Sequence, residues 1–431
     1  MKFPGRRKHK HFFPVEKSNL KSFIAPRSQS IHIVGLDQLL VDIEMKVSDE
    51  FLSRYKFPKG QSFLIADAIS DEIYELAGRE DLIIGEYPGG AIGNTLHNFA
   101  VLSETPCYAL GSIKKQIDLG DYAYKYLSRT SGLVDLTYLE GSTRPMGRAY
   151  CFITPDGERT FAISPGCMND YSMSSLPDEI ITQASAYLLS AYTFRNEGSP
   201  IFKAGLEGSK LAKEGGVPVV FSLGTSMLVE EKREFLQEYI KEYVTVCAMN
   251  LSEAWALVGE CSPPEALDRL LDLCDLAMVT VGPQGVYIGC YTDESELRVT
   301  EERLKIDHGF EDFNKYEYSR AMKKADCDQP TKVFTSMAPF QGGPDIIKNT
   351  NGAGDAALSA LLHDICANDY HRKSVPHSPK HKRKFLTYSS ISQGAKYVNR
   401  ASFEVISQNS ARLIKPLPEK DVTLDEAFWS E

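Results

Sequence analysis

The chain has 431 residues, of which 42% are hydrophobic and 25% are charged, and its formal net charge is −10. This is the composition of a globular protein with a sizeable core, and its acidic balance argues against general nucleic-acid binding, which demands a basic face. No stretch approaches the roughly 18 apolar residues of a membrane span, and the basic start lacks the apolar run of a secretion signal.

The nine cysteines stand singly, and the sequence contains no Cys-x-x-Cys pair. This usage favours free thiols in a reducing compartment over disulfides or a cysteine-based zinc site. We therefore expect a cytoplasmic protein that does not enter membranes or bind nucleic acid.

Residues 1–27 are polar and form a predicted tail with a basic cluster, Arg6, Arg7, Lys8 and Lys10. Most such clusters are solvated tails. The alternative is an anion site for a regulatory nucleotide or for a neighbouring subunit, and the basic segment 371–384 leaves the same question open. We expect residues 28–431 to form a single domain.

Two acids follow the first predicted strand, Ile31 to Val34, in the run Gly35-Leu-Asp37-Gln38-Leu-Leu-Val-Asp42. Carboxylates at the end of a buried strand can accept hydrogen bonds from sugar hydroxyls. The alternative is a loop with a helix cap. Helices are predicted at 49–55 and 67–77, each opening on an aspartate.

A glycine-rich helix start comes next, Pro88-Gly89-Gly90-Ala-Ile-Gly93-Asn94, with apolar residues at helical spacing behind it. Glycines permit a ligand to lie flat against the backbone. Asn94 can either cap the helix or bind a substrate hydroxyl.

Residues 146–163 predict a hairpin with a Pro-Asp-Gly-Glu turn at 155–158. The apolar strand Ala186 to Ser190 then delivers Tyr192 and Arg195. An arginine is more often a surface charge, but its place after a buried strand favours a ligand contact.

Asn250-Leu-Ser-Glu253 follows the strand Val244 to Met249. Its two polar side chains can face one metal or water, or they can form a capping box, and the pattern Asn-x-x-Glu leaves both interpretations open. A predicted strand begins at Leu276 and leads through Thr280 into a turn with Gly282 and Gly285, and a second strand follows. Such a strand–turn–strand can line a nucleotide. Residues 292–345 are polar and predict an insertion.

Asn349-Thr-Asn-Gly-Ala-Gly-Asp355 precedes an amphipathic helix. Free N–H groups at a helix start bind an anion, and Asp355 beside them can take a proton from an attacking hydroxyl, which together suits phosphoryl transfer. A final helix at 392–402 carries Asn399.

Three other interpretations compete for this motif. The plainest is a glycine turn with an aspartate cap. A dinucleotide fingerprint, Gly352-x-Gly354-x-x-Ala357, needs a strand after the helix, whereas residues 370–384 are basic and contain two prolines. A Walker-type loop is absent because the chain has no Gly-Lys dipeptide.

Strands that alternate with helices predict an α/β fold with a mostly parallel central sheet covered on both faces. In such sheets ligands gather beyond the carboxyl ends of the strands. The candidate positions all follow predicted strands or open predicted helices, so we expect them to form one site.

The motifs Gly89-Gly90…Asn94, Asn250-x-x-Glu253 and Thr350-Asn-Gly-Ala-Gly-Asp355 together resemble the ribokinase-like (phosphofructokinase-B type) family of sugar and nucleoside kinases. The resemblance runs from about residue 31 to the C-terminus. Leu39-Leu-Val-Asp42-Ile is similar to the adenosine kinases of this family, and Arg159-Thr-Phe-Ala-Ile-Ser-Pro-Gly166 to members that act on inosine and guanosine.

The resemblance implies ATP-dependent phosphorylation of the 5′-hydroxyl of guanosine and inosine in purine salvage, with Mg²⁺ as cofactor. It also implies a small β lid built from segments near 43–64 and 146–163. Separately, we expect a homo-oligomer. The alternatives are a kinase for adenosine or a free sugar, or a catalytically inactive nucleotide sensor of the same fold.

The resemblance also implies a role for each position. The catalytic group is the base Asp355 with the phosphate-binding backbone of Gly352, Ala353 and Gly354. The nucleoside group is Asp37, Gln38, Asp42, Gly89, Gly90, Gly93, Asn94 and Arg195, with Asp42 and Asn94 on ribose hydroxyls. The ATP group is Thr280, Gly282, Gly285 and Asn399, while Asn250 and Glu253 organise magnesium through water. Many members have Asp where this chain has Asn349; that Asp helps bind activating K⁺, so K⁺ activation is left open.

Overall fold

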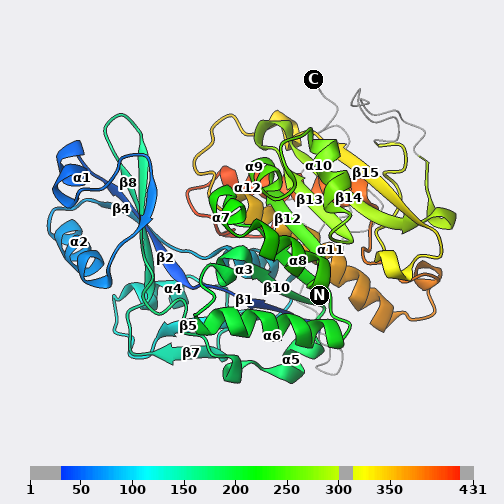
Figure 1. Ribbon diagram of the computed structural model, residues 1–431, viewed down its shortest axis with the longest axis horizontal. Helices are drawn as coiled ribbons and strands as arrows, with labels where there is room; N and C mark the ends of the chain where they lie inside the picture. Colours follow the sequence, from blue (N-terminus) through cyan, green and yellow to red (C-terminus); the bar gives the residue numbers. More distant parts are fainter. Residues whose placement is uncertain (1–30, 300–313, 418–431) are drawn as a thin grey trace.

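One large, mostly parallel sheet forms the middle of the protein (Figure 1). The computed structural model describes residues 31–299 and 314–417, and within them this sheet has ten strands in the order β15-β14-β13-β12-β11-β10-β1-β5-β6, with β7 paired to β5. The strands are β1 (Ile33–Leu36), β5 (Cys107–Lys114), β6 (Val134–Asp135), β7 (Leu139–Ser142), β10 (Ala186–Ser190), β11 (Val219–Ser222), β12 (Val244–Asn250), β13 (Leu276–Thr280), β14 (Val286–Asp293) and β15 (Pro330–Met337). Only β14 pairs antiparallel in the described part of this sheet, with β13 and β15.

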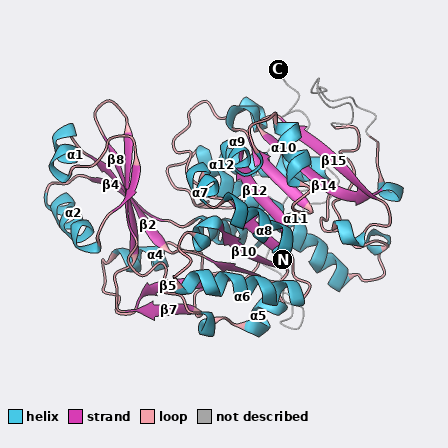
Figure 2. Ribbon diagram, in the orientation of Figure 1, coloured by secondary structure: helices cyan, strands magenta, loops and turns pink. Residues whose placement is uncertain are grey.

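Helices cover both faces of this sheet (Figure 2). Its central strands are apolar runs, and every residue of β10 is buried, as expected of a strand packed on both sides. Neighbouring residues point to opposite faces, so Ile33 joins one hydrophobic cluster and Val34 the other. The first cluster includes α3 (Ala91–Ser103), α11 (Ala353–Ser374) and α12 (Ile391–Ile406), and the second includes α6 (Pro200–Glu214), α8 (Arg233–Tyr243), α9 (Leu251–Val258) and α10 (Pro263–Leu270).

A smaller lobe carries its own sheet, in the order β3-β9-β8-β2-β4 (Figure 1). Its strands are β2 (Leu40–Lys46), β3 (Ser62–Leu64), β4 (Ile83–Pro88), β8 (Gly147–Ile153) and β9 (Arg159–Ser164). Both predicted lid segments contribute strands, and β4 with helix α2 (Asp67–Arg79) joins them. Ile43, Ile73 and Phe152 help form a separate hydrophobic cluster, so this lobe has a core of its own.

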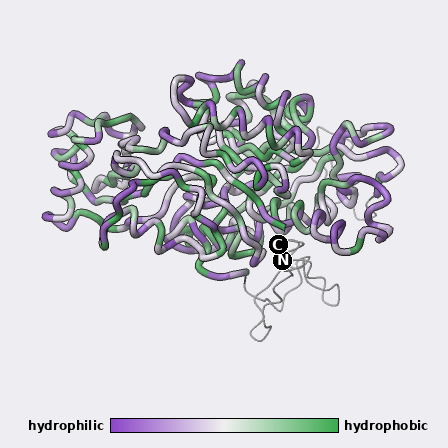
Figure 3. Tube along the Cα trace, turned by 90° about the horizontal axis from the view of Figure 1, so that it is seen from below, coloured by the Kyte–Doolittle hydropathy of each residue, from purple (hydrophilic) through white to green (hydrophobic). Residues whose placement is uncertain are grey.

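Figure 3 shows the hydrophobic stretches gathered inside the larger lobe and the hydrophilic ones toward its outer turns. All nine cysteines are free, as predicted. No helix in the described ranges is long and apolar enough to cross a bilayer.

Two segments differ from expectation. The predicted insertion 292–345 contains β15, which pairs antiparallel with β14 and forms the edge of the main sheet. The pairing runs from Val286 opposite Met337 to Asp293 opposite Pro330. The basic segment 371–384 is not wholly a loop, because α11 continues to Ser374.

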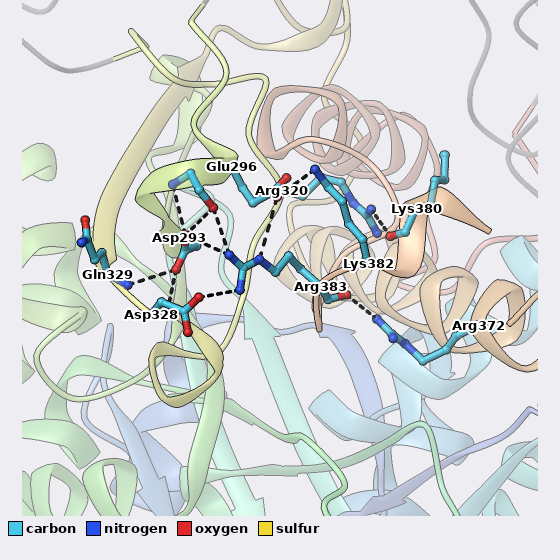
Figure 4. Close-up of polar contacts among 10 residues, drawn as sticks. Asp293, Glu296, Arg320, Asp328, Gln329, Arg372, Lys380, Lys382 and Arg383 are labelled. Atoms are coloured by element: carbon cyan, nitrogen blue, oxygen red, sulfur yellow. Dashed lines mark hydrogen bonds and ion pairs between the residues drawn. The ribbon is translucent and has the colours of Figure 1, made fainter. Parts of the chain in front are cut away.

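The rest of that basic segment is fastened to the neighbouring acids (Figure 4). Lys382 pairs with Glu296 at 2.9 Å, and Arg383 pairs with Asp328 at 2.6 Å. Arg372 donates to the Arg383 carbonyl at 3.1 Å. Several of its cations therefore serve to hold the segment in place. The cluster at Arg6 to Lys10 lies outside the described residues.

Candidate functional site

The N-terminus of α11 presents first-turn N–H groups, of which that of Ala353 also donates to the Thr350 carbonyl at 3.3 Å. Its N-cap, Gly352, has a φ of 78°, in the left-handed region that favours glycine, and a Cβ there would come within 2.5 Å of the Ala411 Cβ. No side chain in the described residues caps this helix end. Ala353 and exposed Gly354 lie in the first turn, so their backbone is accessible to a ligand. The first-turn N–H groups therefore suit an anion such as phosphate.

Asp355 lies in this first turn and meets α3. Its Oδ2 accepts a hydrogen bond from Asn94 Nδ2 at 3.1 Å, across 261 residues of sequence. Asn94 is in the first turn of α3 and is 5% exposed. The starts of two helices, singled out separately in the sequence, thus lie side by side.

Asp37 and Asp42 bring two more carboxylates to the start of α3. Asp37 Oδ2 accepts from Gly93 N at 2.8 Å, and Gly90, with φ of 91°, lies so close that a Cβ would fall 2.2 Å from the same oxygen. Asp42 lies against Gly89, where a Cβ would be 2.6 Å from Asp42 Oδ2. These glycines allow the carboxylates to approach the helix backbone closely.

Four carboxyl groups share this region. Burial raises the pKa of Asp37, Asp42, Glu253 and Asp355 to about 7. The charge of Asp355 further raises the pKa of the other three, while Arg412 lowers that of Asp355 and Asp42. Near neutral pH the cluster therefore carries protons that isolated carboxylates would have lost.

Asn250 and Glu253 form a capping box at the start of α9. Asn250 Oδ1 accepts from Glu253 N at 2.9 Å, and Glu253 Oε2 accepts from Asn250 N at 3.0 Å. Asn250 Nδ2 also donates to Glu253 Oε1 at 2.7 Å. Within the described residues, no three His, Cys, Asp or Glu side chains converge to hold a metal. This donor set suits magnesium held through water and phosphate oxygens, which Mg²⁺ tolerates well.

The predicted ATP residues gather around the end of β15. Gly285 lies against the Met337 carbonyl, and Asn399 Nδ2 donates to the carbonyls of Met337 and Ala338 at 3.1 and 2.7 Å. Thr280 ends β13 beside Asn250 in register. Gly282 opens the 3₁₀ turn Gly282–Gln284 between β13 and β14. Asn399 thus holds a strand end, and the capping box lies between this group and the carboxylates.

The remaining nucleoside candidates lie at the edge of the carboxylate cluster. Gln38 is 5% exposed and donates to Asn169 Oδ1 at 2.5 Å. Arg195 lies over the Tyr192 ring at 5.1 Å. Burial, with the charges of Glu253, Asp355 and Asp42, raises the pKa of Tyr192 to about 12, so this ring faces the cluster.

Both polar atoms of the Asn349 side-chain amide form hydrogen bonds within the protein. Its Oδ1 accepts from Asn351 N at 2.9 Å, and its Nδ2 donates to the Asn409 carbonyl at 2.9 Å. Each of these oxygens has one N–H donor and keeps a second lone pair, so the amide at this position is satisfied without a cation and K⁺ activation stays open.

Sequence reasoning missed Arg412. It lies in the irregular segment after α12, is 3% exposed, and donates from Nε to Asn94 Oδ1 at 2.9 Å. No periodicity or glycine pattern marks it, so nothing in the local sequence could have placed it here.

Comparisons with known proteins agree on one family. The pattern of the pfkB family carbohydrate kinases matches residues 79–302. Over 433 aligned residues, covering all of both chains, the protein is 45% identical to the guanosine-inosine kinase of Escherichia coli strain K12.

Solved structures show the same fold. The adenosine kinase of Sinorhizobium meliloti superposes with a TM-score of 0.62 at 20% identity, covering 92% of this chain and 98% of that one. A probable sugar kinase of Rhizobium etli CFN 42 gives a TM-score of 0.62 at 20% identity, covering 93% and 98%. The predicted ribokinase-like fold is confirmed.

We predict that Asp355→Asn stabilises the ligand-free protein increasingly as pH rises. The folded pKa, about 7, exceeds the ordinary value of 3.8, so the stability linked to this carboxyl is complete at low pH and is lost as pH rises through 7. The melting temperature of the variant relative to the parent should rise by about 2–4 °C between pH 5 and pH 8. Asp156→Asn, at an exposed carboxyl paired with Lys59 at 2.7 Å, should show no such rise. A flat difference for Asp355→Asn would contradict the prediction.

We further predict that Asn349→Asp creates a dependence of stability on K⁺. The new carboxylate would face the Asn409 carbonyl, so two acceptors would oppose each other unless a cation lay between them. Thermal unfolding should show a loss of about 2 °C or more in tetramethylammonium chloride that KCl largely restores. The parent protein should melt alike in both salts; a parent that K⁺ stabilises strongly would refute this.

Proposed function

The chain belongs to the pfkB family of carbohydrate kinases, and on that premise we propose that it transfers the γ-phosphate of ATP to the 5′-hydroxyl of guanosine and inosine, forming GMP and IMP in purine salvage. Full-length identity of 45% to a guanosine-inosine kinase supports this substrate class. The observation that carries the chemistry is the placement of Asp355 in the open first turn of α11, hydrogen-bonded to Asn94.

Asp355 acts as the general base. Its pKa of about 7 lies close to the pH of the cytoplasm, where a base combines sufficient ionisation with sufficient basicity. It takes the proton of the nucleoside 5′-hydroxyl as that oxygen attacks the γ-phosphorus and ADP leaves on the opposite side. The backbone N–H groups of Gly352, Ala353 and Gly354 stabilise the charge that spreads over the transferring phosphoryl oxygens.

The nucleoside lies across the start of α3. Asp42 and Asn94 hold the ribose hydroxyls, with Asp37, Gln38 and the backbone of Gly89, Gly90 and Gly93 beside them. Arg195 and Tyr192 close the side of the pocket that faces the purine ring of the nucleoside. The lobe of β2, β3, β4, β8 and β9 is the lid, and its closure excludes water, which would otherwise accept the phosphoryl group.

ATP lies on the side of Thr280, Gly282, Gly285 and Asn399. Bound magnesium neutralises phosphate charge, and Asn250 and Glu253 would hold it through water. The steps above use no potassium, and activation by K⁺ stays an open question at Asn349. A cytoplasmic location and a homo-oligomeric state remain predictions from the sequence.

Two other functions remain to be tested. A kinase for adenosine or for a free sugar would use the same base and anion site. A catalytically inactive sensor would bind nucleotide without turnover, and the carboxyl of Asp355 beside the helix start favours transfer over that alternative.

A screen of acceptors tests the substrate class. ADP release is measured with ATP and Mg²⁺ upon addition of guanosine, inosine, adenosine or ribose. We expect kcat/KM for guanosine and inosine to exceed that for adenosine and ribose by about tenfold or more, the scale of discrimination between close analogues. Preference for adenosine or ribose would replace the substrate class, and no turnover with any acceptor would favour the sensor.

The role of the base is tested by Asp355→Asn. We expect kcat to fall about 100-fold or more while the Kd for guanosine changes little, because the amide keeps its shape but cannot take a proton. Asp364→Asn is a matched control: Asp364 is in the same helix and is 2% exposed, but it binds the backbone N–H groups of Tyr388 and Ser389. That variant should lose stability and keep its chemical rate. Near-normal turnover by Asp355→Asn would overturn the assignment.

A further inference from the structure

Arg412 reaches the site from the segment that follows α12. The segment from Ser407 to Leu413 follows α12, and its arginine is buried between α3 and the first turn of α11. Nε donates to Asn94 Oδ1 at 2.9 Å, and Nη1 donates to Thr130 Oγ1 at 2.8 Å. The guanidinium also lies over the Tyr126 ring at 4.9 Å.

We propose that Arg412 is a positioning residue for phosphoryl transfer, which orients the Asn94 amide toward Asp355 and the nucleoside. The proposal rests on the function proposed above. Arg412 acts through Asn94 and not by contact with the reacting atoms.

The chemistry of the two side chains sets the direction of the amide. A guanidinium can only donate hydrogen bonds, so Asn94 must turn its carbonyl oxygen toward Arg412. Its NH₂ group then faces Asp355, where it donates to Oδ2 at 3.1 Å. A flipped amide would oppose its oxygen to the Asp355 carboxylate and its NH₂ to the guanidinium, so both contacts would be lost.

The segment that carries Arg412 is fixed on both sides. Asn98 Nδ2 donates to the Ala411 carbonyl at 3.2 Å, and Asn98 Oδ1 accepts from Leu413 N at 2.7 Å. Ala411 in turn packs on Gly352, the N-cap of α11. Because the segment contacts α3 and α11 together, it can hold the guanidinium in one place relative to both.

Arg412 also sets the charge around the base. The groups that face Asp355 are Asp37 and Asp42 after β1, Glu253 on α9, Tyr192 after β10, and Asn94 with Arg412. Among these described groups Arg412 is the cation. Its charge opposes the effect of burial on the pKa of Asp355 and of Asp42.

A second nitrogen of Arg412 suggests the main alternative, in which the guanidinium binds the substrate directly. Arg412 Nη2 is buried and has no hydrogen-bond partner among the described residues. It lies beside Gly93, 3.2 Å from where a Cβ would stand. If Nη2 bound the substrate itself, loss of Arg412 would matter whether or not Asn94 were present.

A double-mutant cycle separates the two roles. Steady-state kinetics with guanosine are measured at pH 7 for the full chain, Arg412→Gln, Asn94→Ala and the double variant. We expect Arg412→Gln to lower kcat/KM about 30-fold or more in the parent and less than about threefold in the Asn94→Ala background, as for residues that act as a unit. Independent, multiplying effects would overturn the proposal.

The pH profile and a conservative variant give a second readout. Arg412→Gln should shift the acid limb of the kcat/KM profile upward by about half a pH unit or more, because a nearby positive charge is lost. Arg412→Lys should keep that limb near its parent position, while KM for guanosine stays raised because an ammonium lacks the planar fork. Profiles that do not move in Arg412→Gln would contradict the proposal.

Arg320→Gln is the matched control. Arg320 is another buried arginine whose Nη2 donates to an asparagine, Asn368 Oδ1, at 2.7 Å. Asn368 lies about 20 Å further along α11 than Asp355, and Figure 4 shows Arg320 in the region of the basic segment. This variant should lose thermal stability without changing the pH profile or KM for guanosine.

Two safeguards keep the outcomes distinct. If Arg412→Gln does not fold, the cycle is run with Thr130→Val, which frees Nη1 and keeps the charge; its loss in kcat/KM, about threefold or more, should vanish in the Asn94→Ala background. Absence of ADP release by the parent protein would overturn the proposed function, whereas an active parent with independent Arg412 and Asn94 effects would overturn this inference alone.

Discussion

The hydrogen bond between Asn94 and Asp355 is the contact on which the arrangement of the site depends. It joins the first turns of α3 and α11, two helices that pack on the same face of the central sheet. The carboxylates of Asp37 and Asp42 approach one helix start, and the open N–H groups of α11 form the other. If these helices moved apart by even one side-chain diameter, the carboxylates at the start of α3 and the first turn of α11 could no longer meet at a common ligand.

The same contact has an electrostatic cost that the fold must offset. Four carboxyl groups are crowded where burial raises the pKa of each to about 7, and Asp355 adds repulsion to the other three. Two hydrophobic clusters, one on each face of the central sheet, provide the rigidity that holds these carboxyl groups together. On the proposed function, hydroxyl donors of a bound nucleoside would relieve part of this cost, and substrate binding and stability would be coupled.

The sequence predicted the fold well where one local pattern dominates. Buried runs such as Ala186 to Ser190 and Val244 to Met249 are strands because neither face meets water. The secondary structure of polar segments was harder to predict. Pro330–Met337 is exposed at its start and alternates only weakly, so its role as an edge strand depends on pairing with β14, a tertiary effect. The extension of α11 to Ser374 also has a tertiary contact, because Arg372 donates to the carbonyl of Arg383, whose side chain pairs with Asp328.

The limits for the site have a different physical origin. Glycine turns and helix caps have a local sequence pattern, so Gly352, Asn94 and Asp355 could be singled out from the sequence. Asn250 and Glu253 stayed ambiguous because the same spacing serves a capping box and a water-mediated metal contact. Arg412 has no such signature. It donates a hydrogen bond to Asn94 across 318 residues, a contact that forms only because the segment after α12 returns to the first turn of α3. The motifs to which we assign substrate and phosphate binding have a local sequence pattern. The side chain that we propose orients Asn94 comes from an irregular segment, and only three-dimensional contact can identify it.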